Sequence, residues 1–292
     1  MSTDRTHFCA EASSNHNGGL ERAIGLVDAA AAAGFGSVKF QLFTVDDLFS
    51  PEAQKAKPEL ASRVSWELPR DFLPALASHA RSHGLQFSCT PFSLDAVEVI
   101  QPVADFMKVA SYELLWRDLL VQCAQTGLPV VLSTGMASEA EIEVAVETLQ
   151  GAGCSDITLL HCVSAYPTPP SSVNLAAIET LRARTGLPVG WSDHTTEPAV
   201  IERAVHRWGA SFVEMHLDVD GSGAEFGPGH CWLPGPAASV ISRVRMGIDA
   251  DGDGRKVPAP EELFDRDWRA DPSDGLRPLL KTREQLRASF GG

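Results

Sequence analysis

Eight short apolar segments, separated by stretches with helical spacing, constrain the fold of this chain more than any other feature. They cover residues 6–13, 37–43, 85–91, 105–111, 129–135, 157–164, 188–193 and 211–218. Their nearly continuous apolar character is typical of parallel strands that are buried on both faces. Eight such strands in alternation with helices predict an α/β fold, the (β/α)8 TIM barrel.

Polar residues stand near the C-terminal end of each predicted strand, which is where the catalytic groups of such barrels project. In chain order they are Glu11; Lys39 and Gln41; Thr90; Lys108 and Ser111; Ser133; His161 and Ser164; Ser192 and Asp193; Glu214 and His216. One strand that ends in a polar residue carries little information. Eight in succession indicate an enzyme.

The ends of several predicted helices carry recognisable signals. Gly34 is a suitable C-cap for the first helix, and Ser138 with Glu141 forms a capping-box pattern. Asn174 is expected to cap a later helix. The helices in question cover residues 20–33, 139–150 and 175–184.

Length and composition fit one domain. The chain has 292 residues, of which 44% are hydrophobic, and this suffices for the core of one barrel. We expect the barrel to occupy residues 1–250. Residues 251–292 are expected to form a tail packed against it, because about 40 residues cannot build a substantial second core. The charged segment 49–68 is predicted to be a rim loop with some helix.

The formal net charge of −14 argues against nucleic acid or an anionic membrane surface as a partner, because both require clustered Lys and Arg. No basic-then-apolar leader opens the sequence, and no apolar run approaches the length of a membrane span. The six cysteines show no CxxC pair, which favours buried reduced thiols over disulfides. We therefore expect a cytoplasmic protein.

Two histidines are the best candidates for metal ligands. His216 lies near the end of the last predicted strand, and His230 lies in the glycine-rich loop that follows it. Neutral imidazoles suit Mn, Fe, Co or Zn, and two of them leave coordination positions for water and substrate. Glu214 alternates with His216 along the strand and so points the same way. The alternative is that each histidine is hydrogen-bonded and structural.

Two lysines near predicted strand ends indicate an anion site. A lysine inside a barrel is costly to bury unless an anion meets it, and neighbouring hydroxyl groups would complete a phosphate or carboxylate cradle. The lysines are Lys39 and Lys108, and the hydroxyl residues are Thr90, Ser111 and Ser133. Salt bridges from Lys108 to Glu113, or from Lys39 to Asp46, are the alternative.

Glu11 and Tyr166 are further candidates. A carboxylate at the end of the first strand can act as a general acid or base, and its alternative role is to stabilise the following loop. Tyr166 precedes the sequence Pro167-Thr168-Pro169-Pro170, which holds the loop extended over the rim. Its ring would then either face the substrate or plug the mouth of the barrel.

Taken together, the motifs of residues 8–235 resemble the N-acetylneuraminate (sialic acid) synthase family. The resemblance rests on Ala10-Glu11, Asn15-His16-Asn17-Gly18, Val38-Lys39-Phe40-Gln41, Thr90-Pro91-Phe92, Lys108-Val109-Ala110-Ser111, Leu132-Ser133-Thr134-Gly135-Met136, Leu160-His161-Cys162, Tyr166-Pro167-Thr168-Pro169, Trp191-Ser192-Asp193-His194, and Glu214 with His216. The number of matches in the same order makes this similarity specific.

The resemblance implies that phosphoenolpyruvate condenses with the aldehyde of an open-chain amino sugar to give a nonulosonate-like 2-keto acid and phosphate. The residues that would bind phosphoenolpyruvate are Lys39, Thr90, Lys108, Ser111, Ser133 and Ser192. His216 and His230 would hold a divalent metal, Mn in preference to Mg, Co, Fe or Zn. Gln41, Ser164, Tyr166 and Asp193 would contact the substrates, and Glu11 would handle a proton.

Three features depart from the family pattern. The Glu-Lys-His sequence of the last strand is here Glu214-Met215-His216, and the loop Gly-Pro-Asp-His is here Gly227-Pro228-Gly229-His230. The antifreeze-like C-terminal domain of the family has no counterpart in this sequence. We therefore expect a short form, assembled as a homodimer, whose aldehyde differs from free N-acetylmannosamine. An aldolase or lyase that does not use phosphoenolpyruvate, and a catalytically silent ligand-binding barrel, are the alternative functions.

Overall fold

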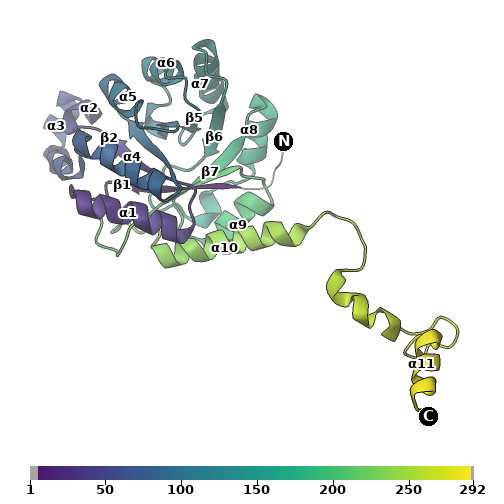
Figure 1. The fold of residues 1–292 in the computed structure, drawn as a ribbon. Helices are drawn as coiled ribbons and strands as arrows, with labels where there is room; N and C mark the ends of the chain where they lie inside the picture. Colours follow the sequence, from purple (N-terminus) through teal and green to yellow (C-terminus); the bar gives the residue numbers. More distant parts are fainter. Residues whose placement is uncertain (1–5, 291–292) are drawn as a thin grey trace. The chain divides into compact units, whose positions relative to one another are not determined.

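The computed structural model describes residues 6–290 and divides into two compact units, Met1–Ala250 and Asp251–Gly292. The first unit contains a sheet of eight parallel strands in the order β3-β2-β1-β8-β7-β6-β5-β4. Figure 1 shows this unit, with helices around its strands. The strands are β1 (His7–Ser13), β2 (Ser37–Leu42), β3 (Gln86–Pro91), β4 (Met107–Val109), β5 (Val130–Ser133), β6 (Ile157–His161), β7 (Val189–Asp193) and β8 (Phe212–His216).

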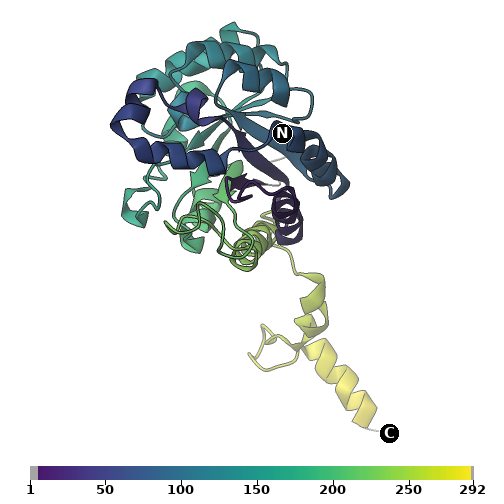
Figure 2. The same ribbon diagram turned by 90° about the vertical axis from the view of Figure 1, so that its left-hand side faces the viewer.

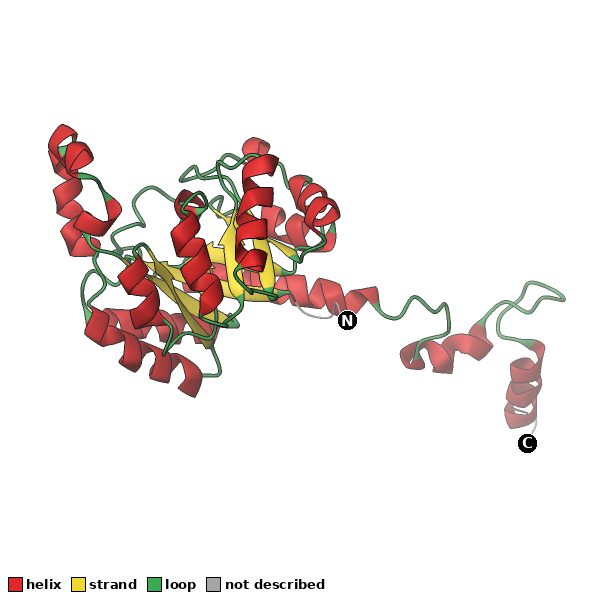
Figure 3. Ribbon diagram, turned by 90° about the horizontal axis from the view of Figure 1, so that it is seen from above, coloured by secondary structure: helices red, strands yellow, loops and turns green. Residues whose placement is uncertain are grey.

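Two junctions close this sheet into a barrel. β1 pairs with β8, which brings the first and last strands together. At the other junction the Asp105 N–H donates to the Phe87 carbonyl oxygen at 2.8 Å, and Ser88 Oγ donates to the Phe106 carbonyl oxygen at 2.7 Å. The strands lie inside a layer of helices (Figures 2 and 3). The predicted (β/α)8 barrel is confirmed.

The helices of the barrel unit include the three that the sequence predicted over residues 20–33, 139–150 and 175–184, each within two residues of its predicted ends. They are α1 (Leu20–Ala33), α4 (Leu73–Ser82), α5 (Leu94–Ile100), α6 (Arg117–Gln125), α7 (Glu139–Gly151), α8 (Ala177–Thr185), α9 (Pro198–His206) and α10 (Pro234–Asp251). Gly34 ends α1 with a φ of 87°, and Ser138 and Glu141 form a complete capping box on α7. The predicted cap at Asn174 is wrong, because Ala176 occupies the N-cap of α8 and Asn174 has a φ of 45°.

The longest connection of the barrel joins β2 to β3. It contains the short helices α2 (Val45–Leu48) and α3 (Pro51–Ala56) and the 3-10 helices η1 (Pro58–Trp66) and η2 (Arg70–Phe72). Thr44 and Ser50 cap the two α-helices through their side chains. The prediction of a rim loop with some helix is confirmed. Two further 3-10 turns, η3 (Ser111–Glu113) and η4 (Pro170–Ser172), follow β4 and β6.

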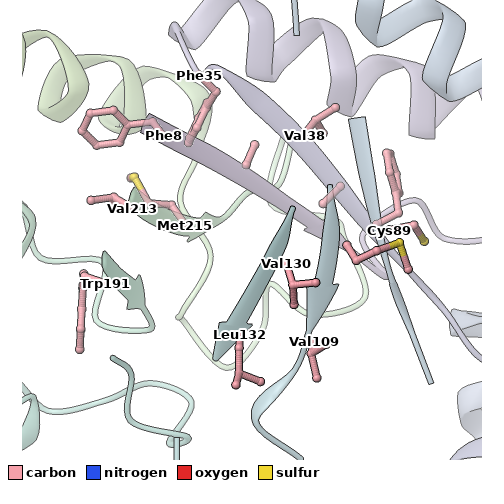
Figure 4. Close-up of a cluster of buried hydrophobic side chains, with 14 of the residues drawn as sticks. Phe8, Phe35, Val38, Cys89, Val109, Val130, Leu132, Trp191, Val213 and Met215 are labelled. Carbon is pink, nitrogen blue, oxygen red and sulfur yellow. The ribbon is translucent and has the colours of Figure 1, made fainter. Parts of the chain in front are cut away.

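Buried apolar side chains fill the space between strands and helices (Figure 4). Alternate residues of each strand point to this layer, among them Val38 and Phe40 of β2 and Met215 of β8. The residues between them point into the barrel. All six cysteines are buried and free, as predicted.

The second unit is held together largely by polar contacts. It contains η5 (Pro260–Trp268) and α11 (Leu280–Phe290). Asp271 is buried and accepts hydrogen bonds from the Ser273 and Leu280 main-chain N–H groups at 3.0 and 2.8 Å. Arg283 contacts both carboxylate oxygens of Asp274 at 2.6 and 2.7 Å. The packing of this segment on the barrel stays a prediction. No helix within the described residues is both long and apolar enough to cross a membrane.

Candidate active site

The strand register brings charged residues together inside the C-terminal end of the barrel. Glu11 of β1 lies opposite Lys39 of β2 on one side and His216 of β8 on the other. Glu214 lies opposite Ser192 of β7. Because side chains alternate along a strand, the same register turns Met215 outward, where it is fully buried among apolar residues. Where the family pattern has a lysine, this chain therefore has Met215 on the outer face of the strand, and the replacement removes no charge from the barrel interior.

Two lysines and two glutamates form the centre of this cluster, and none is more than 4% exposed. Lys39 Nζ contacts Glu11 Oε2 directly and lies 3.7 Å from Glu214 Oε2. Lys108 Nζ lies 3.8 Å from Glu214 Oε1. Burial lowers the pKa of Lys39. Burial also disfavours the charged form of Glu214, but Lys108 and Lys39 outweigh it, so that the pKa of this carboxyl group is lowered.

The alternative salt bridges are not formed. Among the ion pairs of residues 6–290, Lys39 and Lys108 pair only with Glu11 and Glu214. The sequence predicted either an external anion or salt bridges to Glu113 and Asp46, whereas the structure pairs the two lysines with Glu11 and Glu214. An anionic substrate would therefore compete with these carboxylates for the ammonium groups.

Hydroxyl groups from neighbouring strands surround the lysines. Lys39 Nζ donates to Thr90 Oγ1 at 3.2 Å, and Lys108 Nζ donates to Ser133 Oγ at 2.7 Å. Ser192 Oγ donates to Glu214 Oε1 at 2.9 Å. The structure thus places three of the predicted hydroxyl residues at the lysine and glutamate cluster.

Ser111 and Ser164 meet at Gly135. The Gly135 N–H donates to Ser111 Oγ at 3.0 Å, while Ser164 Oγ is buried and has no hydrogen-bond partner. A Cβ atom at Gly135 would lie 2.3 Å from Ser164 Oγ and 2.8 Å from Ser111 Oγ. Glycine is therefore needed here for the two hydroxyl groups to approach the main chain so closely.

Two of the predicted sugar contacts point to the site, and one does not. Gln41 Nε2 donates to Glu11 Oε1 at 3.2 Å. The Tyr166 ring packs 5.1 Å from the His230 ring and 6.0 Å from the His216 ring. Asp193 is fully buried, and its carboxylate accepts from Trp191, Thr195, Thr196 and Trp232. These donors occupy the carboxylate, so its geometry favours a structural role.

The two predicted metal ligands lie together at the rim. The rings of His216 and His230 are 4.8 Å apart, and both residues are buried. His216 Nδ1 and both ring nitrogens of His230 have no hydrogen-bond partner. Burial lowers the pKa of His216, which favours the neutral imidazole that binds metals. A buried histidine pair with free ring nitrogens is the donor set expected of a divalent transition-metal site.

Glu225 belongs to this site and was missed from the sequence. Its Oε2 atom lies 3.5 Å from His216 Nδ1 and 3.7 Å from His230 Nε2. Its Oε1 atom accepts a hydrogen bond from Ser13 Oγ at 2.5 Å, and Asn15 Oδ1 accepts from its main-chain N–H at 2.8 Å. Nothing in the local sequence marks Glu225, because contacts with residues about 210 positions earlier hold it in place.

His194 is the second residue that sequence reasoning left without a role. Its Nδ1 atom donates to the Val163 carbonyl oxygen at 2.7 Å, and its ring lies 5.3 Å from the His216 ring. This hydrogen bond fixes the tautomer and leaves Nε2 as the lone-pair nitrogen. Burial lowers the pKa of His194 to about 3. The signal was available, because His194 stands in the Trp191-Ser192-Asp193-His194 motif.

Comparison with known proteins identifies the family. The model of the NeuB family matches residues 26–256. The chain belongs to the NeuB family. It is 35% identical to the N,N'-diacetyllegionaminic acid synthase of Legionella pneumophila, over 87% of this chain and 75% of that protein. It is 34% identical to the protein of the same name from Campylobacter jejuni, over 88% and 81% of the two chains.

A solved structure supports the same assignment. The N-acetylneuraminic acid synthetase of Leptospira borgpetersenii matches with a TM-score of 0.80 and 27% identity, over 99% of this chain and 93% of that one. These comparisons confirm that the chain belongs to the predicted family, the sialic acid synthases. They also confirm the prediction that it is an enzyme.

Proposed function

We propose that this NeuB family member is a metal-dependent synthase that condenses phosphoenolpyruvate with a sugar-type aldehyde. The products would be a nonulosonate-like 2-keto acid and phosphate. The observation that carries the proposal is the convergence of two buried lysines, Lys39 and Lys108, with a buried histidine pair at the same end of the barrel. The named activities of the relatives belong to the same class of reaction.

The lysines suit an anion with two charged groups. Lys39 and Lys108 are each within 3.8 Å of Glu214, which places their ammonium groups on either side of one carboxylate. Phosphoenolpyruvate carries a carboxylate and a phosphate on neighbouring atoms and could engage both. Thr90 and Ser133 already contact the ammonium groups, and Ser111 and Ser192 complete the proposed binding residues. Charge-assisted hydrogen bonds of this kind are among the strongest in proteins.

The free nitrogens of His216 and His230 fit a divalent metal, and the Glu225 carboxylate beside them supplies a matching negative charge. Mn is our first expectation, followed by Mg, Co, Fe or Zn. When bound, such an ion would polarise the aldehyde carbonyl of the acceptor. Gln41 contacts Glu11, and the Tyr166 ring packs against His230. These two side chains would orient the acceptor, while Ser164 offers a free hydroxyl group.

The reaction balances without any oxidant or reductant. C3 of phosphoenolpyruvate would bond to the aldehyde carbon, and water would add at C2. Collapse at C2 would release phosphate together with the former bridging oxygen. The two protons of water would end on the new hydroxyl group and on phosphate. Glu11 contacts Gln41 and Lys39. We assign to its carboxylate the role of accepting the proton that the attacking water loses as it adds to C2.

Phosphate release tests the proposal. The protein is incubated with phosphoenolpyruvate, Mn²⁺ and a panel of aldoses and acetamido sugars, and phosphate is measured with and without each aldehyde. We expect release that depends on both the metal and the aldehyde. If no aldehyde in the panel stimulates release from metal-loaded protein, the synthase function is rejected. A homodimer, a cytoplasmic location and an acceptor other than free N-acetylmannosamine stay predictions from the sequence.

A further inference from the structure

A second group of metal-binding side chains lies on the outer helices of the barrel. Asp28 comes from α1, and His79 and His83 come from the C-terminal end of α4. The two histidines are four residues apart, so they share one face of the helix. All three side chains are partly exposed, at 52%, 29% and 41% respectively. None of them takes part in the site described above.

The distances match the donor spacing of a metal centre. One ligand atom from each residue lies within 4.8 Å of the others. His79 Nε2 is 2.6 Å and His83 Nε2 is 3.6 Å from the same oxygen, Asp28 Oδ1. In a tetrahedral zinc site with bonds near 2.0–2.1 Å, donor atoms are about 3.3 Å apart. One of the two observed nitrogen–oxygen distances is shorter than this value and the other is longer. Small side-chain rotations would therefore bring the three donor atoms to the spacing of a zinc site.

The orientation of His83 is the second observation. Its Nδ1 atom donates to the His79 carbonyl oxygen at 3.0 Å. This hydrogen bond fixes the tautomer with the proton on Nδ1, so that the Nε2 atom facing Asp28 carries the lone pair. Metal-bound histidines typically show this arrangement, with the other ring nitrogen held by a carbonyl or carboxylate group. A simple ion pair between His79 and Asp28 would not require it.

We propose that Asp28, His79 and His83 form a binding site for a divalent transition-metal ion such as Zn²⁺, with water as the fourth ligand. Two imidazoles and one carboxylate suit Zn²⁺, Co²⁺, Ni²⁺ or Cu²⁺ and are a poor set for Ca²⁺ or Mg²⁺, which prefer oxygen ligands. The ion joins α1 to α4, the helices that come before β2 and before β3. It therefore stabilises this part of the barrel, independently of the reaction at the opposite ends of the strands.

The experiment must separate this site from the histidines at the rim. We would use the double variant His216→Ala/His230→Ala as the background, and measure Zn²⁺ binding by isothermal titration calorimetry and by the shift of the thermal unfolding midpoint. The background protein is expected to bind one Zn²⁺ and to unfold at a higher temperature with it. Adding His83→Ala should weaken binding at least about tenfold and reduce the thermal shift, as should Asp28→Asn.

The matched control is His206→Ala, which removes an exposed histidine from α9. It should leave Zn²⁺ binding unchanged. The proposal is overturned if the background protein binds no Zn²⁺, or if His83→Ala and Asp28→Asn bind it as tightly as the background does. Because these variants keep all of the phosphoenolpyruvate-binding residues and the readout is binding, the result does not depend on the proposed synthase activity.

Discussion

At the scale of residues, the charges at the mouth of the barrel already balance one another before a substrate binds. Lys39 contacts Glu11, and Lys39 and Lys108 lie 3.7 and 3.8 Å from Glu214. The buried lysines are therefore not unpaired charges. This arrangement keeps both ammonium groups in place and makes anion binding an exchange of partners.

Lys108→Ala tests the anion site at this scale. We expect the Michaelis constant for phosphoenolpyruvate to rise about ten- to a hundred-fold, because one charge-assisted contact worth about 1.5–3 kcal/mol is lost. Steady-state kinetics with phosphoenolpyruvate as the varied substrate measure the change. Lys55→Ala, at an exposed position in α3, is the control. An unchanged Michaelis constant would mean that Lys108 serves only the ion pair with Glu214.

Glu225→Gln tests the proposed metal site at His216 and His230. The substitution keeps the size of the side chain and the hydrogen-bonded loop but removes the negative charge that faces His216 and His230. We expect Mn²⁺ affinity to fall about ten- to a hundred-fold, the range found when a group that supports metal ligands is changed. Calorimetric titration of metal-free protein measures it. Glu147→Gln, which changes an exposed residue of α7, is the control and should leave Mn²⁺ affinity unchanged. If the two variants bind Mn²⁺ equally well, Glu225 does not support the metal ligands.

At the scale of elements, the short turn η3 after β4 carries a partly buried acid, Glu113. Glu113 does not pair with Lys108, and its Oε2 atom is buried with no hydrogen-bond partner. Burial raises its pKa to about 7. The folded state therefore binds this proton more tightly than the unfolded chain, in which the pKa is about 4.3.

This raised pKa predicts the sign of a pH effect. Between about pH 4.3 and pH 7 the folded protein holds more protons than the unfolded protein, so the contribution of Glu113 makes the free energy of unfolding fall as pH rises. Between these pH values, the free energy of unfolding of Glu113→Gln should fall by about 1–3 kcal/mol less than that of the wild type. Urea unfolding of both proteins at pH 4.5, 6 and 8 measures it, with Glu147→Gln as control. If the free energy of unfolding depends on pH in the same way for wild type and Glu113→Gln, burial does not destabilise the charged carboxylate of Glu113.

The elements were predictable where local signals decide them. Gly34 and the Ser138–Glu141 capping box fixed helix ends correctly, because these signals lie within a few residues of the end. The predicted strands ran past the observed ends of β4, β5, β6 and β8. Pairing with neighbouring strands, which the local sequence does not show, decides where a strand ends. Asn174 failed as a cap because its φ of 45° lies in the left-handed region, whereas an N-cap residue usually has an extended backbone, and the helix begins two residues later, after Ala176.

At the scale of the whole molecule, the alternation of strands and helices predicts the barrel, and the barrel predicts that residues at strand ends meet. Glu11, Lys39, Lys108 and His216 were predictable in this way, because all four lie on strands. Glu225 was not, because it lies in a loop that Ser13 and Asn15 hold in place across the junction of β1 with β8. The predicted substrate contact of Asp193 stays a prediction. Four donors already surround its carboxylate, and one of them, Trp232, lies in the loop after β8, which the sequence does not place beside Asp193.

The proposed reaction requires that phosphoenolpyruvate lose phosphate through cleavage of its C–O bond as a carbon–carbon bond forms. The most direct measurement supplies phosphoenolpyruvate with ¹⁸O in the bridging position, together with Mn²⁺ and the aldehyde that stimulates turnover. Mass spectrometry then follows the label. We expect the ¹⁸O in the released phosphate, and an unlabelled 2-keto acid three carbons longer than the aldehyde. Label retained in the organic product, or phosphate released with no lengthened acid, would contradict the account.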